Sequence, residues 1–488
     1  MEPASWGLDT HNTRLQINSA IDVGNVSGLQ LKWVYGLAGN IPRSFPLVSE
    51  DTIFIGDAGF GVVALDRESG CVRWTYEAQG IASAILYRRN NNDVTLYATI
   101  REKGIVALDA VDGMQLWLSA PGDNPIPMYS GTPLVYADDI FVPLSSAEVG
   151  LAMSPFYGCC ETSGGMASIS ASTGETNWYT RTIREQPEIT GRRWLFIETH
   201  GPSGAPVWSA PMLDPKRGLL FFGTGQNYSL PASNTSDAIF AVNVHDGSTR
   251  WIRQFTKDDV YNLACNVGLP NCPDTVGPDV DFGAPPVLAT LPDGREILLA
   301  GQKSGHVHAM NPDTGDVVWQ RKPGRGGALG GVHWGLAVNN QLSLVFVPIS
   351  DIWTGGLTGK GEPAPGLHAL DIETGETRWY HMRKSRCAEL FCWGGISAAI
   401  TATTDLVFIG SMDGMIEAVS AESGKVLWKH DTWQKYTTIN GVETEGGAID
   451  AHGPMLVDDL LIVSSGYASY GQKPGNALLV FKLPEGDQ

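Results

Sequence analysis

Short stretches in which apolar and polar residues alternate recur along the whole chain, and seven of them end in the same way. Each stretch runs into a glycine and, four residues later, a tryptophan. Such short alternation is typical of a β-strand with one buried face, and glycine readily adopts the positive φ that a tight turn requires. The pattern predicts seven β-hairpins of one design, at residues 62–74, 105–117, 166–178, 239–251, 307–319, 367–379 and 416–428.

An eighth hairpin is divided between the two ends of the chain. The stretch ALLVFK (477–482) matches the first half of the repeat, and LQLKWVYG near the start supplies Trp33, which no other copy uses. Repeats of this kind are typical of β-propellers, in which joining the chain ends removes an exposed sheet edge. We predict an all-β, eight-bladed β-propeller of four-stranded antiparallel blades. The tryptophans should stack between blades, and the N- and C-terminal strands should close the last blade.

The spacing of the repeats indicates where the long loops lie. The repeat glycines are about 59 residues apart on average, whereas a minimal four-stranded blade takes roughly 40 to 45 residues. The longest intervals fall between Gly113 and Gly375, so we expect that sector to carry the functional site. No change in composition marks a boundary, and we predict a single domain over residues 1–488.

Net charge restricts the possible partners. A formal charge of −19 disfavours nucleic acids and anionic membranes, which bind to basic surfaces. It favours a basic partner such as an electron carrier. No run of eighteen apolar residues occurs, so no membrane span is expected. The opening residues MEPASWGLDTHNTR lack the charged and apolar segments of an export signal.

Six of the seven cysteines lie in short-range pairs. Such pairs in loops predict disulfides and therefore an oxidising compartment, either periplasmic or extracellular. Reduced thiols in the cytosol are the alternative, whereas zinc is disfavoured because no C-x-x-C pair occurs. The three expected pairs are Cys159 with Cys160, Cys265 with Cys272, and Cys387 with Cys392.

The repeated phrase A-x-D-x-x-T-G-x-x-x-W resembles the tryptophan-docking repeat of quinoproteins, eight-bladed propellers that hold pyrroloquinoline quinone (PQQ) on their axis. The phrases YGCCET, GTGQNYS, VYNLACN, GPDVDFGAPPVL and QKSGHVHAMN are similar to those of the polyvinyl alcohol dehydrogenase branch. The resemblance implies oxidation of a secondary or polymeric alcohol to a ketone or aldehyde by hydride transfer to PQQ. It also implies a divalent cation, and calcium or magnesium prefers oxygen ligands.

The resemblance carries four oxygen ligands onto this chain. Glu148 stands in the family's A-E-x-G context, and Gln226 follows GTG where methanol dehydrogenases have a ligand asparagine. Asn227 offers a second amide oxygen beside it, and Asn262 occupies the position of the family's catalytic aspartate. Relatives that use lanthanides have a further aspartate where this chain has Ala264, so calcium or magnesium is favoured.

Contacts to PQQ also follow from the resemblance. Trp208 matches the tryptophan under the quinone ring, and Lys303 matches the catalytic cation that stabilises charge on the quinone oxygens. We expect Cys159 and Cys160 to form a vicinal disulfide near the quinone. Trp393 is a further cofactor-binding candidate and, like His333 and Trp334, is a candidate for the substrate entrance.

The catalytic base does not follow from the resemblance, because Asn262 is a neutral amide and does not accept protons. We rank Asp259 first as the base, since it begins the same segment, and Asp281 second. No C-x-x-C-H motif for covalent haem is present. Electrons are therefore expected to pass to an external acceptor, a cytochrome c, and no cytochrome domain is expected.

Two other interpretations stay open at this point. A non-enzymatic propeller scaffold, similar to the outer-membrane assembly lipoproteins, shares the repeat but does not require Glu148, Trp208 and Lys303 in family order. A degenerate quinoprotein would bind PQQ and lack the base. Uptake of PQQ and oxidation of alcohols discriminate among the three.

Overall fold

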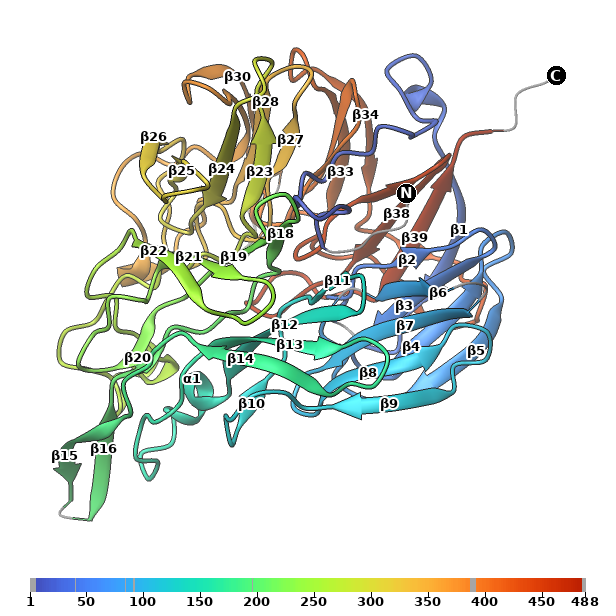
Figure 1. The fold of residues 1–488 in the computed structure, drawn as a ribbon. Helices are drawn as coiled ribbons and strands as arrows, with labels where there is room; N and C mark the ends of the chain where they lie inside the picture. The colour runs from blue at the N-terminus through green and yellow to red at the C-terminus, as the bar shows by residue number, and fades with distance from the viewer. Residues whose placement is uncertain are drawn as a thin grey trace.

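The computed structural model describes residues 6–39, 41–83, 85–90, 93–194, 196–386 and 392–484. Within these ranges the chain forms eight antiparallel sheets of four blade strands each, arranged one after another around a common centre (Figure 1). The predicted eight-bladed β-propeller is confirmed. No helix in the described ranges is long and apolar enough to cross a membrane.

The strands of each sheet run in sequence order from the centre outwards, except in the last sheet. The first four sheets are β2 (Leu47–Val48), β3 (Thr52–Asp57), β4 (Gly61–Asp66), β5 (Val72–Glu77); β6 (Leu86–Asn90), β7 (Asp93–Ile100), β8 (Gly104–Asp109), β9 (Gln115–Ser119); β11 (Leu134–Tyr136), β12 (Asp139–Ser146), β13 (Gly165–Ser170), β14 (Thr176–Arg181); and β18 (Met212–Asp214), β19 (Leu219–Gly223), β21 (Ala238–Asn243), β22 (Thr249–Gln254). The next three are β23 (Val287–Thr290), β24 (Glu296–Gly301), β25 (Val307–Met310), β26 (Val317–Arg321); β27 (Ala337–Asn339), β28 (Leu344–Ile349), β29 (Gly366–Asp371), β30 (Thr377–Met382); and β31 (Thr401–Ala402), β32 (Leu406–Gly410), β33 (Met415–Ser420), β34 (Val426–Asp431).

The eighth sheet joins the two ends of the chain, as the divided repeat predicts. Its order is β37 (Met455–Val457), β38 (Leu460–Ser465), β39 (Ala477–Lys482) and β1 (Gln30–Gly36). Strand β1 pairs with β39 from Gln30 opposite Lys482 to Gly36 opposite Ala477. The last strand of the ring is therefore an early part of the sequence.

The repeat tryptophans connect neighbouring sheets. The Trp74 ring lies against Gly113 of the next sheet, where an added Cβ would approach a ring atom to 2.5 Å. The indole Nε1 of Trp74 also donates to the Ala110 carbonyl at 3.0 Å. Trp33 takes the same place against Gly70, so the predicted stacking is confirmed. Glycine is required there because its φ is positive and because the indole occupies the space of a side chain.

Connections leave the sheets at two opposite ends. The turns between first and second strands and between third and fourth strands lie at one end, which we call the turn face. The loops between second and third strands and between successive sheets lie at the other end, which we call the loop face. All the predicted site residues lie in loop-face segments: Glu148, Cys159, Cys160, Trp208, Gln226, Asn227, Asp259, Asn262, Asp281, Lys303 and Trp393.

Long insertions emerge from the loop face of the third and fourth sheets. The segment between β12 and β13 contains the helix α1 (Glu148–Leu151), and a hairpin of β15 (Glu188–Arg193) and β16 (Ile197–Gly201) extends clear of the propeller (Figure 1). These insertions lie between Gly113 and Gly375, where the repeat spacing predicts elaboration. The other elements are β10 (Pro127–Met128), β17 (Ser203–Gly204), β20 (Asn227–Ser229), β35 (Lys435–Tyr436), β36 (Thr444–Glu445), η1 (Val26–Gly28), η2 (Leu263–Val267) and η3 (Gly355–Leu357).

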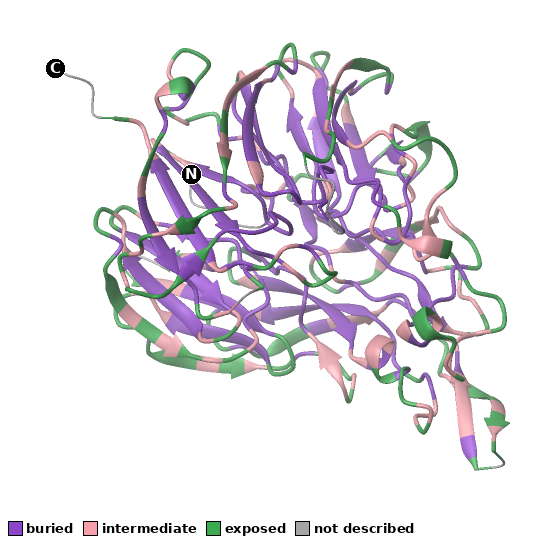
Figure 2. Ribbon diagram, turned by 180° about the vertical axis from the view of Figure 1, so that it is seen from behind, coloured by how far each residue is buried: buried purple, intermediate pink, exposed green. Residues whose placement is uncertain are grey.

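Burial decreases from the centre of the propeller to its rim. The inner strands are almost wholly buried, whereas outer strands such as β5 and β9 alternate between exposed and half-buried residues (Figure 2). Two of the three expected disulfides, Cys159–Cys160 and Cys265–Cys272, are present. The expected pairing of Cys392 with Cys387 lies outside the described residues.

Candidate functional site

A buried lysine lies at the centre of the loop-face residues. The Lys303 Nζ atom is 3.0 Å from Asp281 Oδ2 and 3.3 Å from Asp279 Oδ1. It also lies 5.3 Å from the centroid of the Trp208 ring. The indole Nε1 of Trp208 donates to the same Asp281 oxygen at 3.0 Å. Three of the predicted site residues, Trp208, Asp281 and Lys303, therefore form one contiguous group.

Two glycines allow this close packing. A Cβ on Gly283 would lie 2.2 Å from the Trp208 ring, and a Cβ on Gly225 would lie 2.9 Å from the Asp281 carboxyl carbon. The next residue, Gln226, donates its backbone N–H to Asp281 Oδ1 at 3.1 Å. The Asp281 carboxylate is thus held by an indole, an ammonium and a backbone amide.

Negative charge exceeds positive charge around Lys303. Burial alone would lower the lysine pKa, but Asp279 and Asp281 raise it above its ordinary value, so the ammonium stays charged. Burial raises the pKa of Asp279, although Lys303 opposes the shift. Burial also raises the pKa of Asp237, and neither of its carboxylate oxygens has a hydrogen-bond partner among the described residues.

Asp259, our first choice for the catalytic base, is engaged with the neighbouring loop. Its side chain is fully buried, and its two oxygens accept the backbone N–H groups of Asp279 and Val280 at 3.0 and 2.9 Å. Burial raises the pKa of Asp259 to about 6, while the hydrogen bond from Val280 lowers it. The carboxylate thus fixes the loop that carries Asp279 and Asp281.

Asp279 was missed by our reading of the sequence. Its side chain is 13% exposed, compared with 5% for Asp281, and it is hydrogen-bonded to Lys303 through one oxygen. The stretch GPDVDFG contains both Asp279 and Asp281, separated by one residue, but the sequence does not show which side chain is more exposed. Asp279 therefore joins Asp259 and Asp281 as a candidate base.

The predicted metal ligand Glu148 is fully hydrogen-bonded within its own loop. Its carboxylate accepts the Tyr157 hydroxyl at 2.6 Å, the Glu161 backbone N–H at 2.8 Å and the Thr162 backbone N–H at 2.7 Å. The Thr162 hydroxyl donates to it as well. The inserted residues after α1 thus fold back and supply these donors.

Two of the other predicted ligands are hydrogen-bonded in the same manner. The side-chain oxygen of Asn227 accepts the Ser233 backbone N–H, and that of Asn262 accepts the Ala264 backbone N–H and begins η2. Gln226 differs, because its Oε1 atom is buried and has no hydrogen-bond partner in the described part of the chain. Among the residues that the structure describes, no group of three or more His, Cys, Asp or Glu side chains converges on one point.

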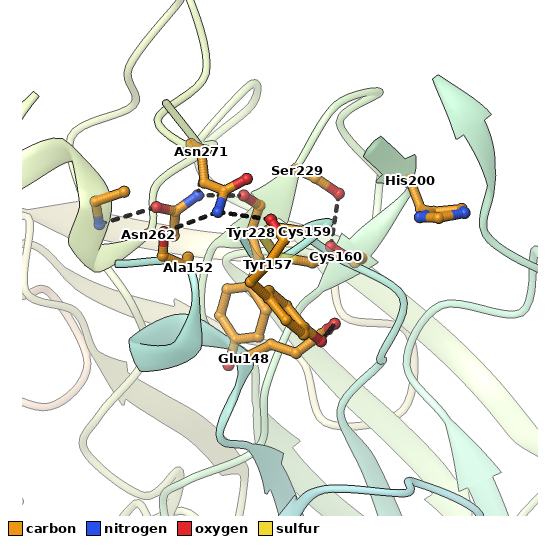
Figure 3. The surroundings of a disulfide bond; sticks show 12 residues. Glu148, Ala152, Tyr157, Cys159, Cys160, His200, Tyr228, Ser229, Asn262 and Asn271 are labelled. Carbon is orange, nitrogen blue, oxygen red and sulfur yellow. Dashed lines mark hydrogen bonds between the residues drawn. A yellow bond between two sulfur atoms is a disulfide. The ribbon is translucent and has the colours of Figure 1, made fainter. Parts of the chain in front are cut away.

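The vicinal disulfide Cys159–Cys160 lies within the same loop as Glu148, as Figure 3 shows. It is buried among Ala152, Tyr228 and Ala264. The backbones of Cys159 and Cys160 exchange hydrogen bonds with that of His200 in β16. The disulfide predicted from the sequence is confirmed, and its location next to the quinone stays a prediction.

Further aromatic residues surround Trp208. Trp334 and His333 meet its ring edge-on, with centroids at 5.5 and 5.8 Å. The Arg43 guanidinium lies 4.9 Å from the centroid of the Trp334 ring and belongs to the same pocket as Trp208. Arg43 was not identified as a site residue from the sequence, because its loop does not match any of the family's phrases. His333 and Trp334 therefore contact Trp208, and their role at the substrate entrance stays a prediction.

Trp393 lies on another part of the loop face. It lines a groove of about 400 Å³ together with Trp353, Tyr380 and Arg383. Its role as a contact of the cofactor stays a prediction.

Comparison with known proteins identifies the family. Residues 24–236 and 357–482 match the family described as outer membrane protein assembly factor BamB. The chain is 34% identical over 496 residues to a polyvinylalcohol dehydrogenase of Pseudomonas sp., covering 98% of this chain and 76% of that protein. It is 33% identical to a polyvinylalcohol dehydrogenase of Sphingopyxis sp. (strain 113P3), covering 96% and 73%. The chain belongs to the polyvinyl alcohol dehydrogenase family.

A solved structure agrees with this assignment at the level of the fold. The quinohemoprotein alcohol dehydrogenase of Comamonas testosteroni superposes with a TM-score of 0.74 at 17% identity, covering all of this chain and 81% of that one. Membership of the polyvinyl alcohol dehydrogenase family confirms the predicted enzyme class, an oxidoreductase of the quinoprotein alcohol dehydrogenase type.

Proposed function

We propose that this member of the polyvinyl alcohol dehydrogenase family uses PQQ to oxidise secondary hydroxyl groups, including those of a polymeric alcohol, to ketones. The observation that carries the proposal is the buried Lys303 ammonium, held by Asp279 and Asp281 above the Trp208 ring. A planar, polyanionic cofactor matches an aromatic face with a fixed cation beside it. The two polyvinylalcohol dehydrogenases that resemble the chain support the substrate class.

The residues present fit PQQ. The Trp208 face supplies a stacking platform, Lys303 supplies positive charge, and the unpartnered Gln226 Oε1 supplies a buried acceptor. Bound PQQ would supply the acceptor for the hydride, a proton with two electrons, that leaves the alcohol carbon. Lys303 then stabilises the charge that develops on the acceptor oxygens, and Asp281 holds both Lys303 and Trp208 in position.

The residues present do not form a calcium-binding site in this arrangement. Calcium requires six to eight oxygen ligands, whereas the oxygens of Glu148, Asn227 and Asn262 are already hydrogen-bonded within the protein. The family implies a metal ion beside PQQ, and calcium or magnesium stays our prediction for it. No step of the proposal depends on that ion.

We assign the catalytic base to Asp279 in preference to Asp259 and Asp281. A base must reach the substrate hydroxyl, and the Asp279 side chain is the most exposed of the three. Its raised pKa makes it a better proton acceptor than an ordinary carboxylate. Asp259 instead positions the loop, because both of its oxygens accept backbone N–H groups.

A scaffold function of the outer-membrane assembly type is the weaker candidate. The family match described by that name leaves out residues 237–356, which include Asp279, Asp281 and Lys303. The two dehydrogenases cover that region as well.

The charge and the disulfides of the protein indicate an electron acceptor and a cellular compartment. We propose that electrons pass to an external acceptor, for which a basic cytochrome c would be complementary to the formal charge of −19. The disulfides Cys159–Cys160 and Cys265–Cys272 support a periplasmic or secreted location.

Titration of purified protein with PQQ tests the function. PQQ uptake is followed by absorbance, with calcium, magnesium or a chelator present, and dye reduction is then measured with polyvinyl alcohol, a secondary diol and a primary alcohol. We expect the protein to take up PQQ and then to oxidise polyvinyl alcohol and the secondary diol. Lys303→Met should abolish uptake or reduction, and Lys322→Met, at an exposed lysine, should not. Absence of PQQ uptake by the unmodified protein would overturn the proposal.

A further inference from the structure

Six large apolar side chains are exposed in two loop-face insertions, the β12–β13 segment and the β15–β16 hairpin. Phe156 is 74% exposed, Trp194 52% and Phe196 73%. Leu151, Met153 and Ile189 are also exposed. Single exposed apolar residues are ordinary, whereas a cluster of this kind marks a binding surface. We call these six residues, three of them aromatic and three aliphatic, the aromatic rim.

The aromatic rim combines two segments that are distant in sequence. The rings of Phe156 and Trp194 have centroids 5.8 Å apart, so the loop after α1 and the tip of the β15–β16 hairpin contact each other. The hairpin extends away from the propeller in both overall views (Figures 1 and 2). The rim therefore forms a ledge that extends from the loop face and is separate from the propeller core.

Several contacts hold this ledge in a fixed position. Arg193 Nη2 donates to the Tyr157 carbonyl and to Asn271 Oδ1 at 2.8 and 2.7 Å. The amide nitrogen of Asn271 lies within 3.1 Å of the carbonyl oxygens of Ala152, Ser154 and Tyr157 (Figure 3). The base of the hairpin is bound to the vicinal disulfide through His200. A ledge fixed in this way loses little conformational entropy on binding.

Charge distinguishes the possible occupants of the rim. Residues 184–200 contain three arginines and three glutamates, so the hairpin is formally neutral in a chain of charge −19. Arg192 is paired with Glu198 at 2.6 Å. A basic electron carrier would be attracted to an acidic surface, whereas aromatic faces without net charge suit an uncharged aliphatic chain.

We propose that the aromatic rim binds a segment of a neutral, hydroxylated aliphatic polymer while another segment of the same molecule occupies the site at Lys303. This inference rests on the proposed function and deepens it. The methylene groups of the polymer pack on the aromatic faces, and its hydroxyl groups stay in water. Tethering one segment raises the effective concentration of the other hydroxyl groups near the reacting centre. The rim thus favours polymers over small alcohols.

Native electrophoresis in gels that contain polyvinyl alcohol tests the rim without any need for activity. We expect the polymer to retard the unmodified protein and to retard Trp194→Ala/Phe196→Ala only at roughly tenfold higher polymer concentration, since tenfold corresponds to about 1.4 kcal/mol. Tyr136→Ala is the matched control, because Tyr136 is 43% exposed in β11 and adjoins the turn face. Equal retardation of all three proteins would overturn the proposal.

Steady-state kinetics separate the rim from the function of the site. The double variant should show about a tenfold higher KM for polyvinyl alcohol with unchanged kcat, and unchanged kinetics with a small secondary diol. If no protein oxidises any alcohol, the proposed function fails while the gel result still decides the role of the rim. If the variant loses only its affinity for cytochrome c, the rim binds a protein and our inference is wrong.

Discussion

Replacing Lys303 by methionine removes a positive charge from a nearly dry site and leaves the shape of the side chain similar. The exposed fractions of the side chains are 7% for Lys303, 13% for Asp279 and 5% for Asp281. Removing one partner of a buried ion pair leaves an uncompensated charge and costs about 3 to 5 kcal/mol of folding free energy. We expect a loss of that size for Lys303→Met at pH 8.

The loss should depend on pH in a defined direction. Without Lys303, the carboxyl pKa of Asp279 rises further, because the charge that favours its ionised form is gone. A carboxyl with a raised pKa in the folded state gives stability that is present at low pH and is lost as the pH rises through that pKa. Burial already raises the pKa of Asp279 to about 7 in the unmodified protein, so the two proteins should differ least near pH 5. The variant should fall further behind above about pH 7, by up to about 1.4 kcal/mol per pH unit.

Urea unfolding of the protein without cofactor, at pH 5 and pH 8, measures both effects. Lys303→Met is compared with Lys303→Met/Asp279→Asn, which removes one of the uncompensated charges and should recover part of the loss. Lys322→Met is the exposed control. A loss below about 1 kcal/mol at pH 8, or a loss that is the same at both pH values, would refute the view of Lys303 as a buried and charged residue.

Three further predictions concern the packing, the Glu148 loop and the response to pH. Gly113→Ala should lower the free energy of unfolding by about 2 to 4 kcal/mol, because the new Cβ meets the Trp74 ring. Gly294→Ala, where φ is also positive but no atom lies within 4 Å, should cost only about 1 kcal/mol. Similar losses in the two variants, measured by urea unfolding, would contradict the role of the tryptophan contact. Glu148→Gln should destabilise the protein by about 2 kcal/mol even in a chelator, because it disrupts charged hydrogen bonds. A change seen only with metal present would instead mark Glu148 as a ligand. Burial raises the pKa of Asp450 to about 6, so its contribution to stability is lost as the pH rises from about 4 to 6. Asp450→Asn should flatten the urea midpoint over that range, and an unchanged slope would show that Asp450 is not the source.

The repeats made the fold predictable because each is a local unit. A hairpin, its glycine turn and its tryptophan are all contained in thirteen residues, so the sequence alone indicates which strands pair. Contacts between sheets follow as well, since a repeat glycine of the next sheet packs against Trp33, Trp74, Trp117, Trp178, Trp251, Trp319 and Trp379. The closure of the propeller ring by the strand that carries Trp33 and by β39 could be predicted for the same reason.

The site was only partly predictable because loops build it. Family phrases indicated Trp208, Asp281 and Lys303, which do lie together. The hydrogen bonds of Glu148 could not be predicted from the sequence. Their donors belong to inserted residues, and the path of these residues depends on the whole loop. The choice of base depended on exposure, and a sequence does not reveal that Asp259 is buried.

The pairing of β1 with β39 also has a consequence for how the protein is made. Gln30 is synthesised long before its partner Lys482, because seven complete sheets lie between them in the sequence. Contacts between such distant residues form slowly, and until they form, two sheet edges are open to pairing with other chains. A nascent or truncated chain thus carries an aggregation hazard that the finished ring does not, and a chaperone that shields β1 should raise the yield of folded protein.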